Sequence, residues 1–297
     1  MRRVAKWIGL TLVVVAVAVA GVFATAWALS EQALGRTWPV QDPPLAQAVA
    51  GASLEHGRHL FATRGCSDCH GADGAGKLLI DAPNVIRIVP SNLTRSVRDP
   101  AWTDDAFAAA IRHGVRPDGT PLMIMPTGDY TDLDDHDVAS IIRYLRTLPE
   151  VANEADRTQV RPLGRVLYLF GQLPLVPAER VDHSPRERKA PPAAADAAYG
   201  RYVAQVCTGC HRSDFSGGLV LEPGTPPSAN LTPHASGLAS WSEADFLHVM
   251  RTGQRPDGRE LHRMMPWRSY SRMQEVELRA IWAYLDSLPP LPSHKRG

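Results

Sequence analysis

Two short stretches of the sequence combine residue types that can bind a prosthetic group. The pattern Cys-x-x-Cys-His occurs at residues 66–70 and again at residues 207–211. Two cysteines at this spacing can form thioether bonds with the vinyl groups of one haem, and the histidine that follows can then coordinate the iron. The sequence therefore predicts two covalently bound haem c groups. The predicted attachment residues are Cys66, Cys69, Cys207 and Cys210, and the predicted iron ligands on one face are His70 and His211.

The number of cysteines favours this interpretation. The chain has four Cys residues, and all four belong to the two motifs. The alternatives are a zinc site that pools both cysteine pairs and a thioredoxin-like redox pair, but neither requires a histidine directly after the second cysteine. A disulfide framework is disfavoured, because the cysteines of each pair lie close together in a long chain.

Alignment of the two motifs reveals an internal repeat. The histidines that end the motifs are 141 positions apart. One domain is therefore used twice, and each copy supports the interpretation of the other. The other matched positions are Asn92-Leu93-Thr94 with Asn230-Leu231-Thr232, Trp102 with Trp241, Arg116 to Gly119 with Arg255 to Gly258, Met125-Pro126 with Met265-Pro266, and Tyr130 with Tyr270.

The repeat also predicts the second ligand of each iron. The loop before the last helix contains Met123 and Met125 in the first copy, and Met264 and Met265 in the second. A lone methionine is usually a core residue. Here Met125 and Met265 both precede a proline and both lie five residues before the matched tyrosine. We therefore expect these two to be the ligands, with the neighbouring Met264 as the alternative in the second copy.

Apolar periodicity and capping residues predict the main helices. Helices are expected at residues 53–64 and 196–206, before the two motifs. Thr103 is typical of the N-cap of a helix through His113, and Ser242 of the N-cap of its counterpart. The last helix of each copy has an apolar stripe at the spacing i, i+3, i+4, i+7, which we expect to pack in the core. The stripes are Val138, Ile141, Ile142 and Leu145, and Leu278, Ile281, Trp282 and Leu285.

The amino terminus predicts a membrane span. A basic tail precedes a run of 23 residues without a charge, from Trp7 to Leu29. This run is long enough to cross a hydrocarbon core of ~30 Å as a helix, with the basic end in the cytoplasm and the rest of the chain outside. The alternative is a cleaved secretory signal, with Ala24-Thr25-Ala26 or Ala26-Trp27-Ala28 as the cleavage site. In both cases the haem domains are exported to the periplasm.

These features together resemble class I c-type cytochromes. The resemblance covers residues 50–150 and 195–290, and rests on the Cys-x-x-Cys-His motif, the Asn-Leu-Thr sequence, a Trp before a helix, the Met-Pro loop and a final helix with Tyr-Leu. It implies a mainly α fold with His/Met ligation of each iron. In particular, the chain is similar to the membrane-anchored dihaem cytochromes of proteobacteria that take electrons from periplasmic dehydrogenases.

The resemblance also implies supporting roles for residues near the haems. A ligating histidine usually donates its second ring N–H to a carbonyl or a carboxylate. In this family a proline carbonyl shortly after the motif often accepts that hydrogen bond, which here points to Pro83 and Pro223. Six matched residues either surround the haem edge or serve as turn and packing residues: Asn92, Trp102, Arg116, Asn230, Trp241 and Arg255.

The expected fold class is therefore mainly α, with two tandem class I cytochrome c domains after one N-terminal transmembrane helix. We place the anchor or signal at residues 1–30, the domains at 50–150 and 196–290, and a linker at 151–195. The apolar stretch from Leu163 to Val176 is too short to span a bilayer, so we expect it to pack against a domain or between the two. Residues 184–195 are rich in Pro and Ala and are expected to form an exposed connector.

Electron transfer is the function that these predictions favour. If both irons have His and Met ligands, neither has an open site for a substrate, and no catalytic residue is assigned. The chain would relay single electrons from a dehydrogenase or a quinol-oxidising complex to a terminal oxidase or a soluble cytochrome. The alternatives are a dihaem peroxidase with one open iron and a fixed cytochrome subunit of a larger oxidase or dehydrogenase. The net charge of +1 gives no argument for a nucleic-acid partner.

Overall fold

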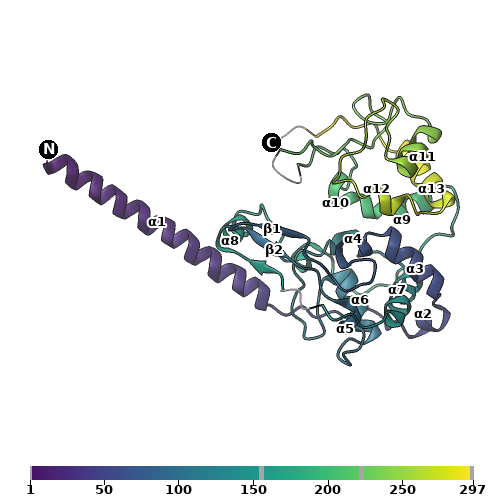
Figure 1. The fold of residues 1–297 in the computed structure, drawn as a ribbon, viewed down its shortest axis with the longest axis horizontal. Coiled ribbons are helices and arrows are strands. Elements are labelled where there is room, and N and C mark those ends of the chain that lie inside the picture. Colours follow the sequence, from purple (N-terminus) through teal and green to yellow (C-terminus); the bar gives the residue numbers. More distant parts are fainter. Residues whose placement is uncertain (1, 154–156, 221–223, 295–297) are drawn as a thin grey trace.

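The computed structural model describes residues 2–153, 157–220 and 224–294 (Figure 1). Helices dominate these residues and strands contribute one small sheet, so the predicted mainly α fold is confirmed. A long N-terminal helix is followed by two helical domains in the order of the sequence. The boundaries assigned to the domains stay predictions.

The N-terminal helix, α1 (Arg2–Gly35), carries the apolar run. Among the described residues it is the one helix that is long and apolar enough to cross a membrane. It continues six residues beyond Leu29, the end of the charge-free run. Its apolar part is exposed, and its buried residues lie near the C-terminal end: Ala26, Ser30 and Ala33.

The first domain is built around two helices that the sequence predicts. α3 (Leu54–Thr63) packs against α7 (Asp135–Thr147), and all four residues of the predicted stripe on α7 are buried. The helices approach closely at Gly57, where a Cβ would lie 1.9 Å from the carbonyl oxygen of Ser140. The other elements are α2 (Ala46–Gly51), α4 (Cys66–His70), α5 (Leu93–Ser96), α6 (Asp104–His113) and the 3-10 helix η1 (Thr127–Asp129).

The second domain repeats this arrangement. α9 (Ala197–Val203) packs against α13 (Glu275–Asp286), and a Cβ on Gly200 would lie 1.8 Å from the carbonyl oxygen of Ala280. Three residues of the predicted stripe are buried, and the fourth, Trp282, packs against the same core from a partly exposed position. The other elements are η3 (Ala204–Cys207), α10 (Thr208–His211), α11 (Glu243–Thr252) and α12 (Trp267–Tyr270).

The predicted N-caps are present in both copies. At the start of α6 the Thr103 side chain accepts a hydrogen bond of 3.1 Å from the backbone N–H of Ala106. At the start of α11 the Ser242 hydroxyl accepts from the Asp245 backbone, and the Asp245 carboxylate accepts from the Ser242 backbone N–H at 2.9 Å. These bonds satisfy backbone donors that have no partner within the helix.

Much of the predicted linker folds onto the first domain. β1 (Ile80–Ala82), β2 (Ile86–Ile88) and β3 (Gln159–Val160) form an antiparallel sheet, in which Ile80 pairs with Ile88 and Ile86 with Val160. α8 (Pro162–Leu169) packs on α1, whereas the sequence predicts that this apolar stretch packs against a domain or between the two. The start of α8 also reaches the first domain, where the backbone N–H of Leu163 donates to the carbonyl of Asn84. The 3-10 helix η2 is Pro177–Arg180.

The prediction that residues 184–195 form an exposed connector is wrong at Arg188. This side chain is buried, and its guanidinium lies 2.6 Å from the carboxylate of Asp42. The same carboxylate accepts a hydrogen bond from the buried His113 at 2.8 Å. An arginine can be buried where a carboxylate compensates its charge, and composition alone does not reveal such a distant partner.

Candidate functional site

Each Cys-x-x-Cys-His motif forms one short helical turn. In the first domain the motif is α4 itself, and it follows Gly65, whose positive φ of 84° turns the chain out of α3. In the second domain Cys207 caps α10, which ends at His211. Residues three apart lie on the same side of a helix, so both cysteines of a motif face one side, and the histidine follows directly.

The structure gives both motif histidines the same hydrogen-bond arrangement. The Nδ1 of His70 lies 2.9 Å from the carbonyl oxygen of Ser91, and the Nδ1 of His211 lies 2.7 Å from that of Ala229. A carbonyl can only accept, so Nδ1 carries the proton and Nε2 keeps its lone pair. Burial lowers the pKa of both imidazoles, although the carbonyl contact partly offsets this. A neutral, oriented imidazole fits the role of an iron ligand.

The residue whose carbonyl accepts the hydrogen bond from His70 differs from the one predicted from the sequence. Pro83 was expected to supply it, but this residue lies in the turn between β1 and β2, and Ser91 accepts instead. Its counterpart Pro223 lies outside the described residues, and Ala229 accepts from His211. In both copies the acceptor is the residue directly before Asn-Leu-Thr. The repeated Asn-Leu-Thr sequence could therefore have identified both acceptors.

Two glycines allow the loop after each motif to approach the loop that carries the accepting carbonyl. A Cβ on Gly76 would lie 2.3 Å from the carbonyl oxygen of Pro90, and a Cβ on Gly217 would lie 2.3 Å from that of Ala229. Both glycines have a positive φ, of 76° and 66°. The backbone after each motif can therefore approach the loop that holds the histidine.

The Asn-Leu-Thr sequences act as turn and clamp residues. The Asn92 side chain accepts from the Thr94 backbone at 3.0 Å and donates to the carbonyl of Val151 at 2.9 Å. Asn230 makes the same pair of bonds, to the Thr232 backbone and to a carbonyl beyond α13. Each Asn thus ties the loop after the motif histidine to the segment that follows the last helix.

The matched Trp and Arg residues likewise serve turns and packing. Trp102 and Trp241 pack against the cores of their domains. Arg116 donates to the carbonyl of Pro121 within its own turn, and Arg255 pairs with Asp257 at 3.5 Å. Of the two interpretations left open by the sequence, these contacts support the packing role.

The two Met-Pro loops share one local structure. Pro126 has φ −77° and ψ 57°, Pro266 has φ −80° and ψ 46°, and each precedes a short helix that leads to the matched tyrosine. The Tyr130 hydroxyl donates to the carbonyl of Arg64 at 2.7 Å. Tyr270 makes a longer contact of 3.5 Å with the carbonyl of Val206, directly before the second motif. Each Met-Pro loop is therefore tied to the chain just before the motif of its own domain.

The surroundings of the methionines differ within each loop. Met125 and Met265 are partly buried, and Met265 packs against the second core. Met123 packs against a separate apolar cluster that contains Leu175 and Val176. Met125 lies outside the three apolar clusters of the described residues, and in the second loop the same is true of Met264 and not of Met265. The choice of ligands stays a prediction.

The structure gives little support to the two alternative roles of the cysteines, a redox-active pair and a zinc site. Burial raises the pKa of Cys66 and Cys207 to about 12, and it also raises the pKa of the other two thiols. A redox-active dithiol instead needs a lowered pKa. Across residues 2–153, 157–220 and 224–294, the group of side chains close enough to hold a metal ion contains no cysteine, and consists of His56, His136 and Asp137.

The two domains dock through their motifs and Met-Pro loops in a reciprocal way. Asp129, which precedes Tyr130, accepts a hydrogen bond of 3.1 Å from Thr208 inside the second motif. Ser269, which precedes Tyr270, donates to Asp68 inside the first motif at 2.6 Å. Figure 1 shows α4 facing α12 across this interface. Burial raises the pKa of Asp129 to about 6, although the bonds from the second motif oppose the rise.

A second pair of reciprocal contacts lies beside the first. Glu277 on α13 accepts from Arg64 at 2.8 Å and from His59 at 2.7 Å, both in the first domain. Asp137, at the matching position of α7, accepts from the hydroxyl of Tyr202 in the second domain at 2.5 Å. The sequence analysis did not identify these residues as functional. The sequence did offer a signal, because Asp137 and Glu277 are acidic residues at matching positions of the two last helices, 140 positions apart.

Comparisons with known proteins agree with this architecture. A family model described as "Cytochrome C oxidase, cbb3-type, subunit III" matches residues 52–145 and again residues 193–285. The chain is 27% identical to one of the subunits of nicotinate dehydrogenase from Pseudomonas putida, over 92% of this chain and 24% of that protein. It is 28% identical to the fructose dehydrogenase cytochrome subunit of Gluconobacter japonicus, over 80% of this chain and 53% of that protein.

A third relative is matched over a shorter region. The cytochrome c subunit of alcohol dehydrogenase (quinone) from Gluconacetobacter polyoxogenes is 36% identical over 94 residues, which are 29% of this chain and 20% of that protein. The chain thus spans between 20% and 53% of the length of these three relatives. The two matches of the family model cover more than half of the chain, and each contains one Cys-x-x-Cys-His motif. The chain belongs to the cbb3-type cytochrome c oxidase subunit III family and carries two cytochrome c domains in tandem.

Proposed function

We propose that this chain is an electron-transfer subunit that binds one haem c in each domain. The observation that carries the proposal is the repeated arrangement of the motif histidine, whose Nδ1 is held by a carbonyl while Nε2 stays available. When bound, a haem c supplies a reversible one-electron carrier. The proposed domain limits are residues 50–150 and 196–290, after an N-terminal segment at 1–30 and with a linker at 151–195.

Each group of residues has a defined task in this proposal. The cysteines of each motif, Cys66 with Cys69 and Cys207 with Cys210, attach the porphyrin. His70 and Met125 would coordinate one iron, and His211 and Met265 would coordinate the other. The tyrosine at the end of each Met-Pro loop keeps that loop beside the motif.

The docked domains act as one relay unit. Residues of each motif contact the Met-Pro loop of the other domain, through Thr208 with Asp129 and Asp68 with Ser269. These contacts hold the two attachment sites next to each other. The relay therefore has two carriers within one chain, and no residue of the chain needs to act as an acid, a base or a nucleophile.

The membrane position follows from α1. We propose that α1 is a retained anchor, with the basic residues Arg2, Arg3 and Lys6 in the cytoplasm and both domains in the periplasm. The relatives named as cytochrome subunits of dehydrogenases support a dehydrogenase as the electron donor. The same names favour a second candidate, in which the chain is a fixed subunit of a dehydrogenase complex. Purification from the native membrane in mild detergent separates the two, since a fixed subunit stays with its catalytic partner.

The experiment that tests the proposal targets the methionines. Met125→Ala and Met265→Ala should each open one iron, so that each variant binds carbon monoxide at one site while the parent binds none. Met123→Ala is the matched control in the first loop, because its side chain packs in an apolar cluster. Met264→Ala tests the alternative ligand in the second loop, and should bind no carbon monoxide if Met265 is the ligand. Carbon monoxide binding by Met123→Ala or Met264→Ala, without binding by the neighbouring variant, overturns the choice of methionine. Binding by the unmutated chain favours an enzyme with an open iron.

A further inference from the structure

The exposed apolar side chains outside α1 are concentrated on one side of the first domain. Among the described residues there are seven exposed large apolar side chains outside this helix. Five of them lie on or beside β1 and α8, and we call these five the apolar fringe: Leu78, Leu79, Ile80, Leu163 and Phe170. The other two, Leu54 and Val220, lie elsewhere in the sequence. Monomeric proteins rarely expose a continuous apolar patch without a partner.

The apolar fringe is attached to the C-terminal end of α1. The guanidinium of Arg165 on α8 bonds to the Ser30 hydroxyl, pairs with Glu31 at 2.5 Å and lies 3.9 Å from the centre of the Trp27 ring. Arg165 is itself buried. The position of α8 along α1 is therefore determined, and it coincides with the end of the charge-free run at Leu29.

The β1–β2 hairpin is fixed to the same junction. The backbone N–H of Leu163 donates to the carbonyl of Asn84 in the hairpin turn at 2.9 Å. Ala33 of α1 shares an apolar cluster with Ile86 and Ile88 of β2. Figure 1 shows the hairpin and α8 together beside the C-terminal part of α1. The five residues of the fringe thus belong to one surface, which has a defined place relative to the membrane span.

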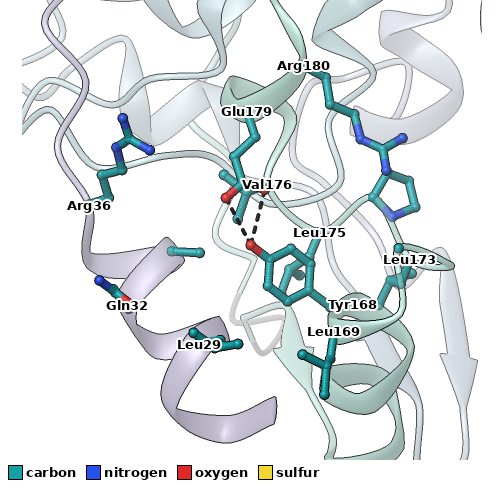
Figure 2. A pocket seen from close by; sticks show the side chains of 13 residues that line it. Leu29, Gln32, Arg36, Tyr168, Leu169, Leu173, Leu175, Val176, Glu179 and Arg180 are labelled. Atoms are coloured by element: carbon teal, nitrogen blue, oxygen red, sulfur yellow. Dashed lines mark hydrogen bonds between the residues drawn. The ribbon is translucent and has the colours of Figure 1, made fainter. Parts of the chain in front are cut away.

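The cavity between α1 and α8 has an apolar end and a charged end. It has a volume of about 520 Å³. In Figure 2, Leu29 and Leu169 lie at one end, while Arg36 and Arg180 lie at the other. Between these ends the hydroxyl of Tyr168 donates to the carboxylate of Glu179 at 2.9 Å. The lining changes from apolar to charged along α1, as the surroundings change from acyl chains to lipid headgroups at a membrane surface.

We propose that α8 and β1 form a second membrane contact, in which the apolar fringe enters the headgroup region of the bilayer beside α1 and holds the first domain against the membrane. The occupant of this surface is a phospholipid bilayer with anionic lipid. Continuity with α1 supports this assignment, because the fringe begins where the span ends. Charge supports it as well, since Lys77 borders the fringe and Arg36 and Arg180 lie above the apolar end of the cavity. The acids at these places are compensated in part: Asp81 pairs with Arg87 and Arg161, and Glu179 accepts from Tyr168. The inference rests on the proposed role of α1 as a retained anchor.

The test uses the full holoprotein in vesicles of phosphatidylcholine and phosphatidylglycerol. The vesicles contain a phosphatidylcholine with a photoactivatable group near the top of its acyl chain, and labelled peptides are identified by mass spectrometry after illumination. We expect labels in α1, in the segment 78–80 and in the segment 163–170. Labels in α1 without labels in the fringe overturn the second contact, and that result also fits a protein partner as the true occupant. No label in α1 overturns the anchor as well, so the two failures are distinguishable.

A double variant and a control variant are compared by the labelling of segment 78–80, which neither of them alters. Changing Leu163→Asp together with Phe170→Asp should lower the labelling of the distant segment 78–80 by about tenfold, because two apolar side chains no longer enter the lipid. The labelling of α1 should not change. Leu54→Asp is the matched control, since Leu54 is 45% exposed and Leu163 is 42% exposed. Equal labelling of segment 78–80 in both variants contradicts the proposal, and an unchanged haem absorbance verifies that the variants are folded.

Discussion

The ion pair between the two domains offers the sharpest test of how the chain is held together. Glu277 on α13 pairs with Arg64 and His59 of the first domain, and its carboxylate also accepts from the backbone N–H of Gln274. Both Arg64 and Glu277 are buried. Glu277→Ala removes the carboxylate that is hydrogen-bonded to the buried guanidinium of Arg64, which is costly because a buried charge needs a partner.

The size of the effect can be obtained in two ways. Burial by itself raises the pKa of Glu277, but the hydrogen bond from His59 and the charge of Arg64 outweigh it, and the pKa falls from 4.5 to about 2. At 1.36 kcal/mol for each pKa unit, this shift corresponds to a stabilisation of about 3 kcal/mol. Removal of one partner from a buried ion pair typically costs about 3–5 kcal/mol. We therefore expect Glu277→Ala to lower the free energy of unfolding by about 3 kcal/mol at pH 7.

The pH dependence provides a second check. The pKa of Glu277 is lower in the folded chain than in the unfolded chain, so its contribution is fully present above pH 4.5. The contribution is lost as the pH falls through about 2. The difference between the parent and Glu277→Ala should therefore shrink between these two pH values.

The assay is denaturation by guanidinium chloride in detergent, followed by tryptophan fluorescence and haem absorbance. Glu275→Ala is the matched control on the same helix, because Glu275 pairs with Arg279 at 2.8 Å while both side chains are exposed. Such surface pairs contribute about 0.5 kcal/mol or less. If Glu277→Ala and Glu275→Ala have equal unfolding free energies, or if their difference persists at low pH, the ion pair does not hold the domains as argued.

Three further predictions concern the haem sites and the helix crossings. Cys207→Ala should weaken or lose one covalent haem while the other stays attached, and the intact mass of the purified chain measures this; two fully retained haem masses contradict it. Gly200→Ala should destabilise the second domain by several kcal/mol, because its Cβ would lie 1.8 Å from the carbonyl oxygen of Ala280. Thermal unfolding measures this effect. It should show little change for the control Gly128→Ala, where no atom lies within 4 Å of the added Cβ. Tyr130→Phe removes the hydrogen bond that ties the first Met-Pro loop to its motif and should cost about 1 kcal/mol of stability. An unchanged free energy of unfolding refutes this role.

The contacts that organise the motif histidines depended on tertiary structure. Pro83 was a reasonable choice from its distance after the motif, yet the carbonyl of Ser91 accepts from His70. The acceptor depends on how closely two loops approach, and Gly76 permits that approach through its positive φ and its missing Cβ. A distance counted along the sequence does not contain this information.

The sequence by itself determined the local features and the periodic ones. The two Cys-x-x-Cys-His motifs, the repeat, the apolar run of α1, the stripes of the last helices and the N-caps at Thr103 and Ser242 all follow from short-range patterns. Tertiary structure alone decided how the domains dock and where the linker lies. Glu277 meets Arg64 from 213 positions away, and residues 159–160 complete a sheet with β2. Such pairings need only one complementary partner somewhere in the chain, so they leave no periodic trace in the sequence.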